Sequence, residues 1–243
     1  MSRTKFGLFA TLLLGTAAPA WAGPPYLTDD PAPTDLRQWE IYSFIADEGI
    51  GSTQDADAGF DLNYGAAEGV QLTATLPMSF SRNKPEGWRS GAGGVEVAVK
   101  YRFLNDEEHG VSAAIFPRVI LPTSSLEDGG KTRILLPVWI EKDFAGGTSL
   151  FGGGGYELNP GAGNRNFWQA GVALTHDVSK TLSLGAEVTR QGSDTDDATV
   201  QTRAGAGAIA KLSDHVSLLF SGGPTWEDHQ TGYHAYGALG FFF

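Results

Sequence analysis

The sequence has no cysteine, little positive charge and few charged residues of either sign. The absence of cysteine among 243 residues excludes a disulfide scaffold and any thiolate-bound zinc or iron–sulfur site. Lys and Arg number 17 against 28 Asp and Glu, a net charge of -11, so no basic surface is available to displace counterions from a nucleic acid. Charged residues make up 19%, whereas about 25% is typical. What is abundant is glycine, with 33 residues, about twice its usual share.

The first 22 residues have the pattern of an export signal. Arg3 and Lys5 form a positive start, an apolar stretch runs to Ala18, and a small-x-small cleavage site ends at Ala22. We therefore expect residues 1–22 to be a cleavable signal peptide. Beyond it no run of 18 consecutive apolar residues occurs, so we expect no membrane-spanning helix in the mature chain.

The rest of the chain alternates apolar and polar residues with a period of two, which is typical of strands. The clearest run extends from Val95 to Phe103, where valines and aromatic residues alternate with Glu96, Lys100 and Arg102. Most of the predicted strands are about as long as the ~9–11 residues that a tilted strand needs to cross a bilayer. The alternation predicts twelve of them, at 37–46, 59–65, 70–78, 94–104, 111–122, 132–143, 149–158, 166–177, 182–191, 199–212, 216–225 and 233–243.

The connections between these strands are expected to sort by length. Odd-numbered connections are long, such as 47–58, 79–93 and 226–232, whereas even-numbered ones, such as 213–215, are short. A barrel with both chain ends in the periplasm has short periplasmic turns and longer extracellular loops. We therefore predict an all-β fold, a twelve-stranded antiparallel transmembrane β-barrel over residues 37–243, located in the cell outer membrane.

Aromatic residues support this membrane prediction. The last strand carries an apolar face that ends on Phe243, a pattern typical of the signal that outer-membrane proteins present to the barrel assembly machinery. Aromatic side chains near strand ends are expected to form the two interfacial girdles of such a barrel. They are Trp39, Tyr101, Phe103, Phe167, Trp168, Tyr233, Phe241 and Phe243.

A family resemblance lies at the start of the mature chain. Residues 23–31 (GPPYLTDDP), followed by 38–42 (QWEIY), resemble the start of the outer-membrane transporters associated with the meta-pathway of phenol degradation. Over the rest of the chain the likeness is a general barrel pattern. The resemblance implies a porin-like or small-molecule uptake role with no catalytic residues, and it names no substrate.

The polar partner at each alternation is expected to line the lumen. Two interpretations remain open: a polar channel whose charges set selectivity, or a closed lumen in which the charges pair with one another. Barrels of about eight strands are filled by side chains and those of ~16–18 strands hold water, so twelve strands do not decide between them. The lumen-lining candidates are Glu96, Lys100, Arg102, Arg118, Arg133, Glu141, Glu187, Arg203, His234 and Tyr236.

Residues 23–36 precede the first strand and are too rich in proline to join a sheet. One hypothesis is that they fold into the lumen as a plug, with the carboxylates of Asp29 and Asp30 pairing with an arginine of the wall. The arginines available for this are Arg102, Arg118 and Arg133. The alternative is a periplasmic tail.

Three motifs invite other functions and are interpreted structurally. Residues 205–210 (GAGAIA) match a dinucleotide fingerprint, but that motif needs a following helix, and here small residues alternate within a strand. Gly152–Gly155 lacks the Lys-Ser/Thr of a phosphate loop and is expected to allow a bend or the close approach of the plug. His215 and Ser217 have the spacing of the catalytic pair in outer-membrane lipid hydrolases, but His215 falls in a predicted inner turn.

No metal site or cofactor is predicted. The acidic run Asp194–Asp197 lacks the ligands of a calcium loop, and the five histidines share no ligand spacing. Loop acids such as Glu127 and Asp128 are expected to be solvated or to bridge lipopolysaccharide phosphates through divalent cations.

The function predicted from sequence is that of a channel and not of an enzyme. Small molecules, hydrophobic or aromatic ones included, would pass by diffusion. The expected partners are that solute, outer-membrane lipids and lipopolysaccharide, with no nucleic acid. The alternatives are a lipid hydrolase, a structural barrel with a filled lumen, and a secreted soluble sandwich.

Overall fold

The computed structural model describes residues 25–126 and 130–243. The expected signal peptide, the first two residues of the family-like segment and the loop acids Glu127 and Asp128 lie outside these ranges. In the described part of the chain, no helix is long and apolar enough to span a membrane.

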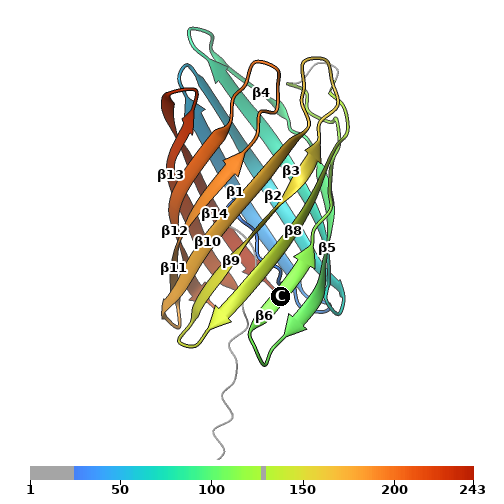
Figure 1. Ribbon diagram of the computed structural model, residues 1–243, viewed down its shortest axis with the longest axis vertical. Coiled ribbons are helices and arrows are strands. Elements are labelled where there is room, and N and C mark those ends of the chain that lie inside the picture. The colour runs from blue at the N-terminus through green and yellow to red at the C-terminus, as the bar shows by residue number, and fades with distance from the viewer. Residues whose placement is uncertain (1–24, 127–129) are drawn as a thin grey trace, which may run out of the picture.

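The described chain folds into one antiparallel β-sheet that closes on itself as a tilted barrel (Figure 1). The strands are β1 (Trp39–Ile50), β2 (Thr53–Ala67), β3 (Val70–Asn83), β4 (Trp88–Ala92), β5 (Glu96–Asp106), β6 (Val111–Ile115), β7 (Arg118–Ile120), β8 (Arg133–Phe144), β9 (Thr148–Leu158), β10 (Phe167–Ser179), β11 (Leu182–Gln191), β12 (Gln201–Ser213), β13 (Val216–Glu227) and β14 (Gln230–Phe242).

These fourteen segments make twelve barrel positions. β4 and β5 pair with successive parts of β3, and β6 and β7 both lie between β5 and β8, so each pair is one interrupted strand. The second interruption holds Phe116 and Pro117, and proline has no N–H with which to continue a ladder. β1 and β14 close the barrel, with Glu40 opposite Phe242 and Gly49 opposite Tyr233. The predicted twelve-stranded barrel is confirmed.

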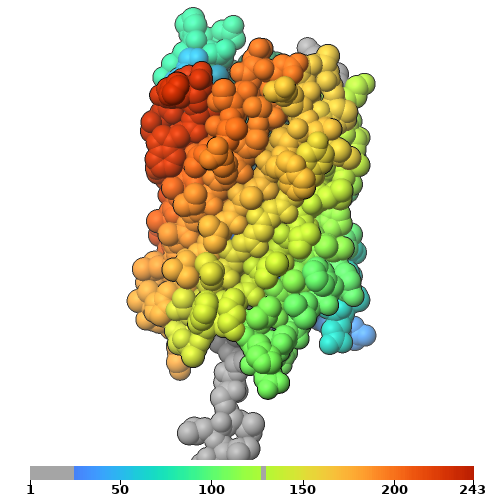
Figure 2. All heavy atoms as spheres, in the orientation of Figure 1, coloured from blue at the N-terminus to red at the C-terminus, as the bar shows by residue number. Residues whose placement is uncertain are grey.

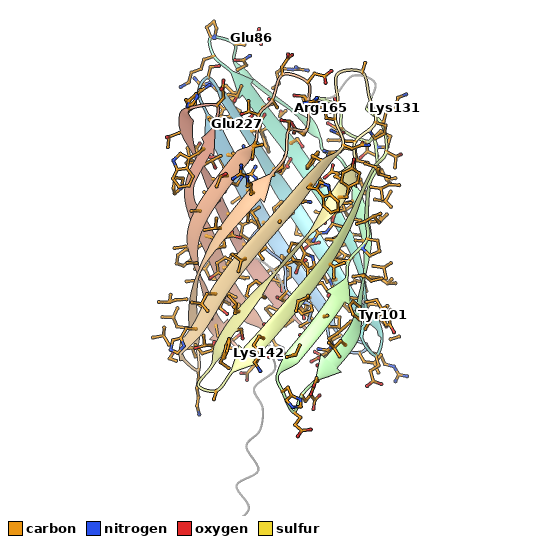
Figure 3. The ribbon with its side chains drawn as sticks, in the orientation of Figure 1. Glu86, Tyr101, Lys131, Lys142, Arg165 and Glu227 are labelled. Atoms are coloured by element: carbon orange, nitrogen blue, oxygen red, sulfur yellow. The ribbon has the colours of Figure 1, made fainter. Side chains whose placement is uncertain are left out.

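The outer wall is apolar because alternate residues of each strand face outward. In β5, Val99 is 40% exposed whereas the neighbouring Lys100 is 2% exposed. The same face carries Tyr101, which points away from the barrel (Figure 3). The space-filling view shows tilted strands covering the visible face without a hollow (Figure 2). The alternation predicted for this strand is therefore confirmed.

One residue that was expected in the aromatic girdles, Phe167, faces the lumen instead. Phe167 is only 6% exposed and lies opposite Glu157, which is also buried. It shares the lumen side of β10 with Gln169, whereas the adjacent Trp168 is 68% exposed on the outer wall. Because alternation puts neighbours on opposite faces, the two aromatic residues could not both belong to the girdle.

The connections between strands differ less in length than expected. The region 47–58 was expected to be a long loop, but β1 and β2 continue through it to a tight turn at Gly51 and Ser52. Likewise β13 and β14 meet at Asp228 and His229, whose φ angles of 43° and 61° suit a two-residue hairpin turn. The connections 121–132, 159–166 and 192–200 do remain long.

Candidate functional site: the barrel lumen

Residues 25–36, which we call the lumen segment, lie inside the barrel. Its residues contact the inward faces of β3, β5, β11 and β13, which stand on different sides of the lumen. The segment adds one isolated bridge to the sheet, between Leu36 and Gly65, and forms no strand. Pro31 and Pro33 have no N–H to offer a ladder, which explains why it crosses the lumen and does not join the wall.

The first anchor of the lumen segment is the carboxylate of Asp29. One of its oxygens accepts a hydrogen bond from Lys100 at 2.9 Å, and the other accepts one from Arg118, also at 2.9 Å. The Lys100 ammonium also donates to the carbonyl oxygens of Asp30, at 3.0 Å, and Ala32, at 3.3 Å. A cation as buried as Lys100 is costly unless it is paired, and here the segment supplies its hydrogen-bond partners.

Two further anchors use threonines in the same way. Thr28 donates both its N–H, at 2.9 Å, and its hydroxyl, at 3.0 Å, to the carboxylate of Glu187. Thr34 donates its N–H and hydroxyl to the amide oxygen of Gln71, at 2.8 and 3.0 Å. At the start of the segment the Ser221 hydroxyl donates to a backbone carbonyl. Buried donors of the segment are thus matched by acceptors of the wall.

Glycines of the wall let the segment approach closely. A Cβ at Gly65 would collide with the backbone of the segment, and one at Gly185 would collide with the hydroxyl of Tyr26. Burial raises the pKa of Tyr26 to about 12, with the Glu187 carboxylate adding to the effect, so this phenol is neutral. Gly152–Gly155 does not serve the segment: side chains there would meet β8 and β10. The expectation of a plug contact at those four glycines is wrong.

The structure distributes the predicted lumen residues among several ion pairs. Of the three arginines considered as partners of the segment, Arg118 pairs with it, whereas Arg133 pairs with Glu157 at 3.4 Å. Arg203 pairs with Glu48 at 2.8 Å.

The remaining candidates also occupy the inner face. Arg102 is half-buried there and forms no ion pair with the described part of the segment. The other plug candidate, Asp30, is 7% exposed and accepts a hydrogen bond from the backbone of Ala32. His234 lies beside the Thr225 hydroxyl, with 3.3 Å between Nδ1 and Oγ1. Glu141 is buried.

The described residues leave open space in the lumen, including a central cavity and an outer cavity. The central cavity, of about 280 Å³, lies between the lumen segment and a wall formed by Phe116 and by residues of β1, β2, β3, β5, β7 and β14. The outer cavity, of about 290 Å³, includes Glu227, which lies at the upper end of the barrel in Figure 3. Its lining is mostly polar and acidic, with Glu48, Asp55 and Asp194 around Arg203.

Of the aromatic side chains inside the lumen, Tyr236 was predicted from the sequence, whereas Phe116 and Phe44 were not. Phe116 is 4% exposed, with the Lys100 ammonium 4.8 Å and the Arg118 guanidinium 4.2 Å from its ring centre. On the same cavity Phe44 and Tyr236 stack, with ring centres 6.2 Å apart. Phe44 lies four residues after Glu40 on the same strand, so the two side chains share one face, and this alternation could have predicted that Phe44 faces the lumen. Phe116 follows an interruption of its strand, where alternation gives no guidance.

The motifs for other chemistry are not assembled. His215 bonds through Nδ1 to the carbonyl of Phe242 at 2.9 Å, while Ser217 is fully buried and its hydroxyl has no hydrogen-bond partner among the described residues. The pair therefore lacks the contact that a hydrolase needs between base and nucleophile. Residues 205–210 lie within β12, and Tyr26 packs against Gly207. Residues 25–126 and 130–243 contain no group of acids and histidines that could hold a metal ion.

Comparison with known proteins shows the fold. No protein-family model and no curated protein matches the sequence, so the resemblance to the phenol meta-pathway transporters stays a prediction. Solved structures do match. An outer-membrane channel from Pseudomonas putida F1 is 9% identical with a TM-score of 0.73, covering 88% of this chain and 98% of that one.

Two porins are also similar. NanC porin has a TM-score of 0.59 at 11% identity, covering 84% of this chain and 98% of its own. KdgM porin, solved in complex with disordered oligogalacturonate, has a TM-score of 0.56 at 10% identity, covering 83% and 98%. Identities this low show the fold alone. The chain is an all-β barrel of the outer-membrane type.

Proposed function

We propose that this protein is an outer-membrane channel through which small molecules diffuse, and that the lumen segment narrows the passage. The observation that carries the proposal is that the lumen holds polar side chains and open space. Inside an apolar outer wall, charged and polar side chains leave a central cavity of about 280 Å³ and an outer cavity of about 290 Å³. A barrel that served only as a structural body would be expected to fill this space with packed side chains.

The similar structures support the same function. The Pseudomonas putida protein is a channel, and NanC and KdgM are porins. Passage of aromatic or hydrophobic molecules, the finer part of the proposal, is supported by the rings of Tyr26, Phe44 and Tyr236 on the central cavity. An enzymatic role has no comparable support, because His215 and Ser217 do not meet.

The decisive experiment compares the full chain with a variant lacking residues 25–35 in a planar lipid bilayer. The lumen segment contributes only one isolated bridge to the sheet, so the barrel ladder remains in the variant. We expect the full chain to conduct and the deletion to raise the single-channel conductance. A heat-dependent gel shift of both proteins is the control for folding. Equal conductance would contradict the role of the segment, and no conductance from either protein would contradict the channel.

A further inference from the structure

We propose that the central cavity binds a small organic cation, an ammonium group carried on an aromatic or aliphatic body. This inference rests on the proposed channel function and names the class of solute that the channel takes. The cavity, of about 280 Å³, is at the small end of the ~300–1,000 Å³ usual for small-molecule sites. Its size suits a molecule with one ring or a short chain.

The cations of the cavity wall are already held in ion pairs, so an anionic solute finds no unpaired positive charge there. Lys100 directs its ammonium to Asp29 and to two backbone carbonyls of the lumen segment. Arg118 pairs with Asp29 at 2.9 Å and with Glu96 at 3.3 Å. Both positive charges are therefore neutralised by two carboxylates that line the same cavity.

Two other carboxylates of the cavity lack a cation. Glu40 of β1 and Asp61 of β2 lie on adjacent strands, and neither forms an ion pair with any described residue. Glu40 accepts a hydrogen bond from the Tyr42 hydroxyl at 2.9 Å. Asp61 accepts one from the Thr75 hydroxyl at 3.0 Å and one from the Asn63 amide at 3.4 Å.

These partners are neutral, and the nearest cations, Lys100 and Arg118, are held in ion pairs by Asp29 and Glu96. Carboxylates withdrawn from bulk water are stabilised by a counter-ion. A cation bound in the cavity would supply that charge for Glu40 and Asp61.

The aromatic side chains beside these acids fit the rest of such a ligand. Phe44 and Tyr236 line the cavity as a parallel pair, with an interplanar angle of 11°. Ring faces attract ammonium groups and also cover hydrocarbon. The arrangement therefore places the positive group at Asp61 and Glu40 and the apolar body against the two rings. Two neighbouring acids without a cation and two stacked rings in one enclosed space favour a cation over a neutral or anionic molecule of the same shape.

Binding can be measured on the purified full-length protein in detergent with three probes that share one ring. Benzylammonium is the cation, benzyl alcohol the neutral analogue and benzoate the anion, each titrated by calorimetry. We expect benzylammonium to bind at least about tenfold more tightly than the other two, as loss of a charge-assisted hydrogen bond implies. We expect Asp61→Asn and Glu40→Gln each to weaken benzylammonium binding by a similar factor.

Asp214→Asn is the matched control, because Asp214 is exposed in the turn between β12 and β13. It is expected to bind benzylammonium as the unmodified protein does. Each variant is checked for the heat-dependent gel shift, and Phe44→Leu provides a further cavity variant that keeps every charge. Equal binding of benzoate or benzyl alcohol would overturn the proposal, as would unchanged benzylammonium affinity in the cavity variants.

The outcome is separable from that of the proposed function. A protein that conducts in bilayers but does not bind benzylammonium would overturn the cation site and leave the channel standing. A protein that binds benzylammonium through Asp61 but never conducts would leave the site standing and overturn the channel.

Discussion

At the residue scale, the docking of the lumen segment depends strongly on one side chain, that of Asp29. Its two carboxylate oxygens are each 2.9 Å from a different wall cation, Lys100 on one side and Arg118 on the other. Hydrogen bonds to charged groups contribute about 1.5–3 kcal/mol each, more than neutral ones. Without Asp29 the buried ammonium of Lys100 would keep only backbone carbonyls as partners. The position of the lumen segment is therefore sensitive to this one charge.

Asp29→Asn is expected to loosen the lumen segment. The amide keeps the shape of the carboxylate but removes the charge that both cations share, so the undocked population should rise by about tenfold or more. The measurement is the rate of maleimide labelling at Ala32→Cys, a buried position in a chain that otherwise has no cysteine.

The control is Asp35→Asn, in the same segment, where the side chain is exposed and forms no ion pair with any described residue. We expect the protein with Asp35→Asn and Ala32→Cys to be labelled as slowly as the protein with Ala32→Cys alone. Equal labelling rates in the Asp29→Asn and Asp35→Asn proteins would show that the Asp29 charge does not hold the segment.

At the scale of elements, the lumen segment and the wall strands are stabilised in different ways. Wall strands share continuous backbone ladders, whereas the segment is attached by side chains at Lys100, Glu187 and Gln71. An element held by a few separate bonds can leave without disturbing the ladders around it. This is the arrangement expected of a plug that moves, and a cross-link tests it.

A disulfide between Thr28→Cys and Gly171→Cys should lock the segment to β10. An ideal Cβ at Gly171 lies 3.3 Å from the Cβ of Thr28, so a small outward shift brings the pair into the ~3.5–4.5 Å range of disulfides. If solutes pass only when the segment moves, the oxidised protein will conduct little and reduction will restore conductance. The single Thr28→Cys protein, treated with the same oxidant, is the control. Identical conductance in the oxidised and reduced double variant would mean that solutes pass beside a stationary segment.

At the scale of the whole molecule, the barrel separates two environments by the alternation of its strands. Large apolar side chains are exposed around the outer wall, while buried Lys100, Glu187 and His234 face the lumen. An exposed apolar surface that encircles the molecule is unfavourable in water and suits the lipid of a membrane. The soluble sandwich that the sequence left open does not match this surface.

Val172→Arg should destabilise the barrel more than Val178→Arg. Both valines are exposed in β10, at 49% and 55%, but Val172 is in the middle of the strand and Val178 near its end. An arginine facing lipid costs about 2–4 kcal/mol at the midplane and about 0–1 near the interface. Guanidinium unfolding in phospholipid vesicles measures the difference in free energy. Equal costs at the two positions would contradict the proposed placement of β10 across the bilayer.

Much of the wall could be predicted because alternation is local information. The run around Val99 assigns inner and outer faces correctly, since a strand needs only its own residues to define them. Phe167 was misassigned because it was judged by its type and its closeness to a strand end, not by its parity with Gln169. The turn at Asp228 and His229 was missed because the strands continue through polar residues.

The sequence predicted that a segment could fill the lumen, but it predicted few of the contacts that hold this segment. A proline-rich segment with two aspartates suggested a plug, and Arg118 was among its expected partners. Lys100 as its most buried partner was not expected, nor were the Glu187 and Gln71 anchors. The contacts of Asp29 with Lys100 and Arg118 span 71 and 89 residues of sequence, and that of Thr28 with Glu187 spans 159. No local pattern carries information across such separations.

The sequence by itself determined an acidic, cysteine-free barrel of twelve strands with an apolar outside and a polar inside. These properties depend on composition and on the direction of alternate side chains, which the chain specifies residue by residue. Only the tertiary structure decided what faces what across the lumen: Asp29 between two cations, and Glu40 and Asp61 beside the rings of Phe44 and Tyr236. The physical reason is closure, because the curvature and tilt of the whole sheet set which inward side chains meet.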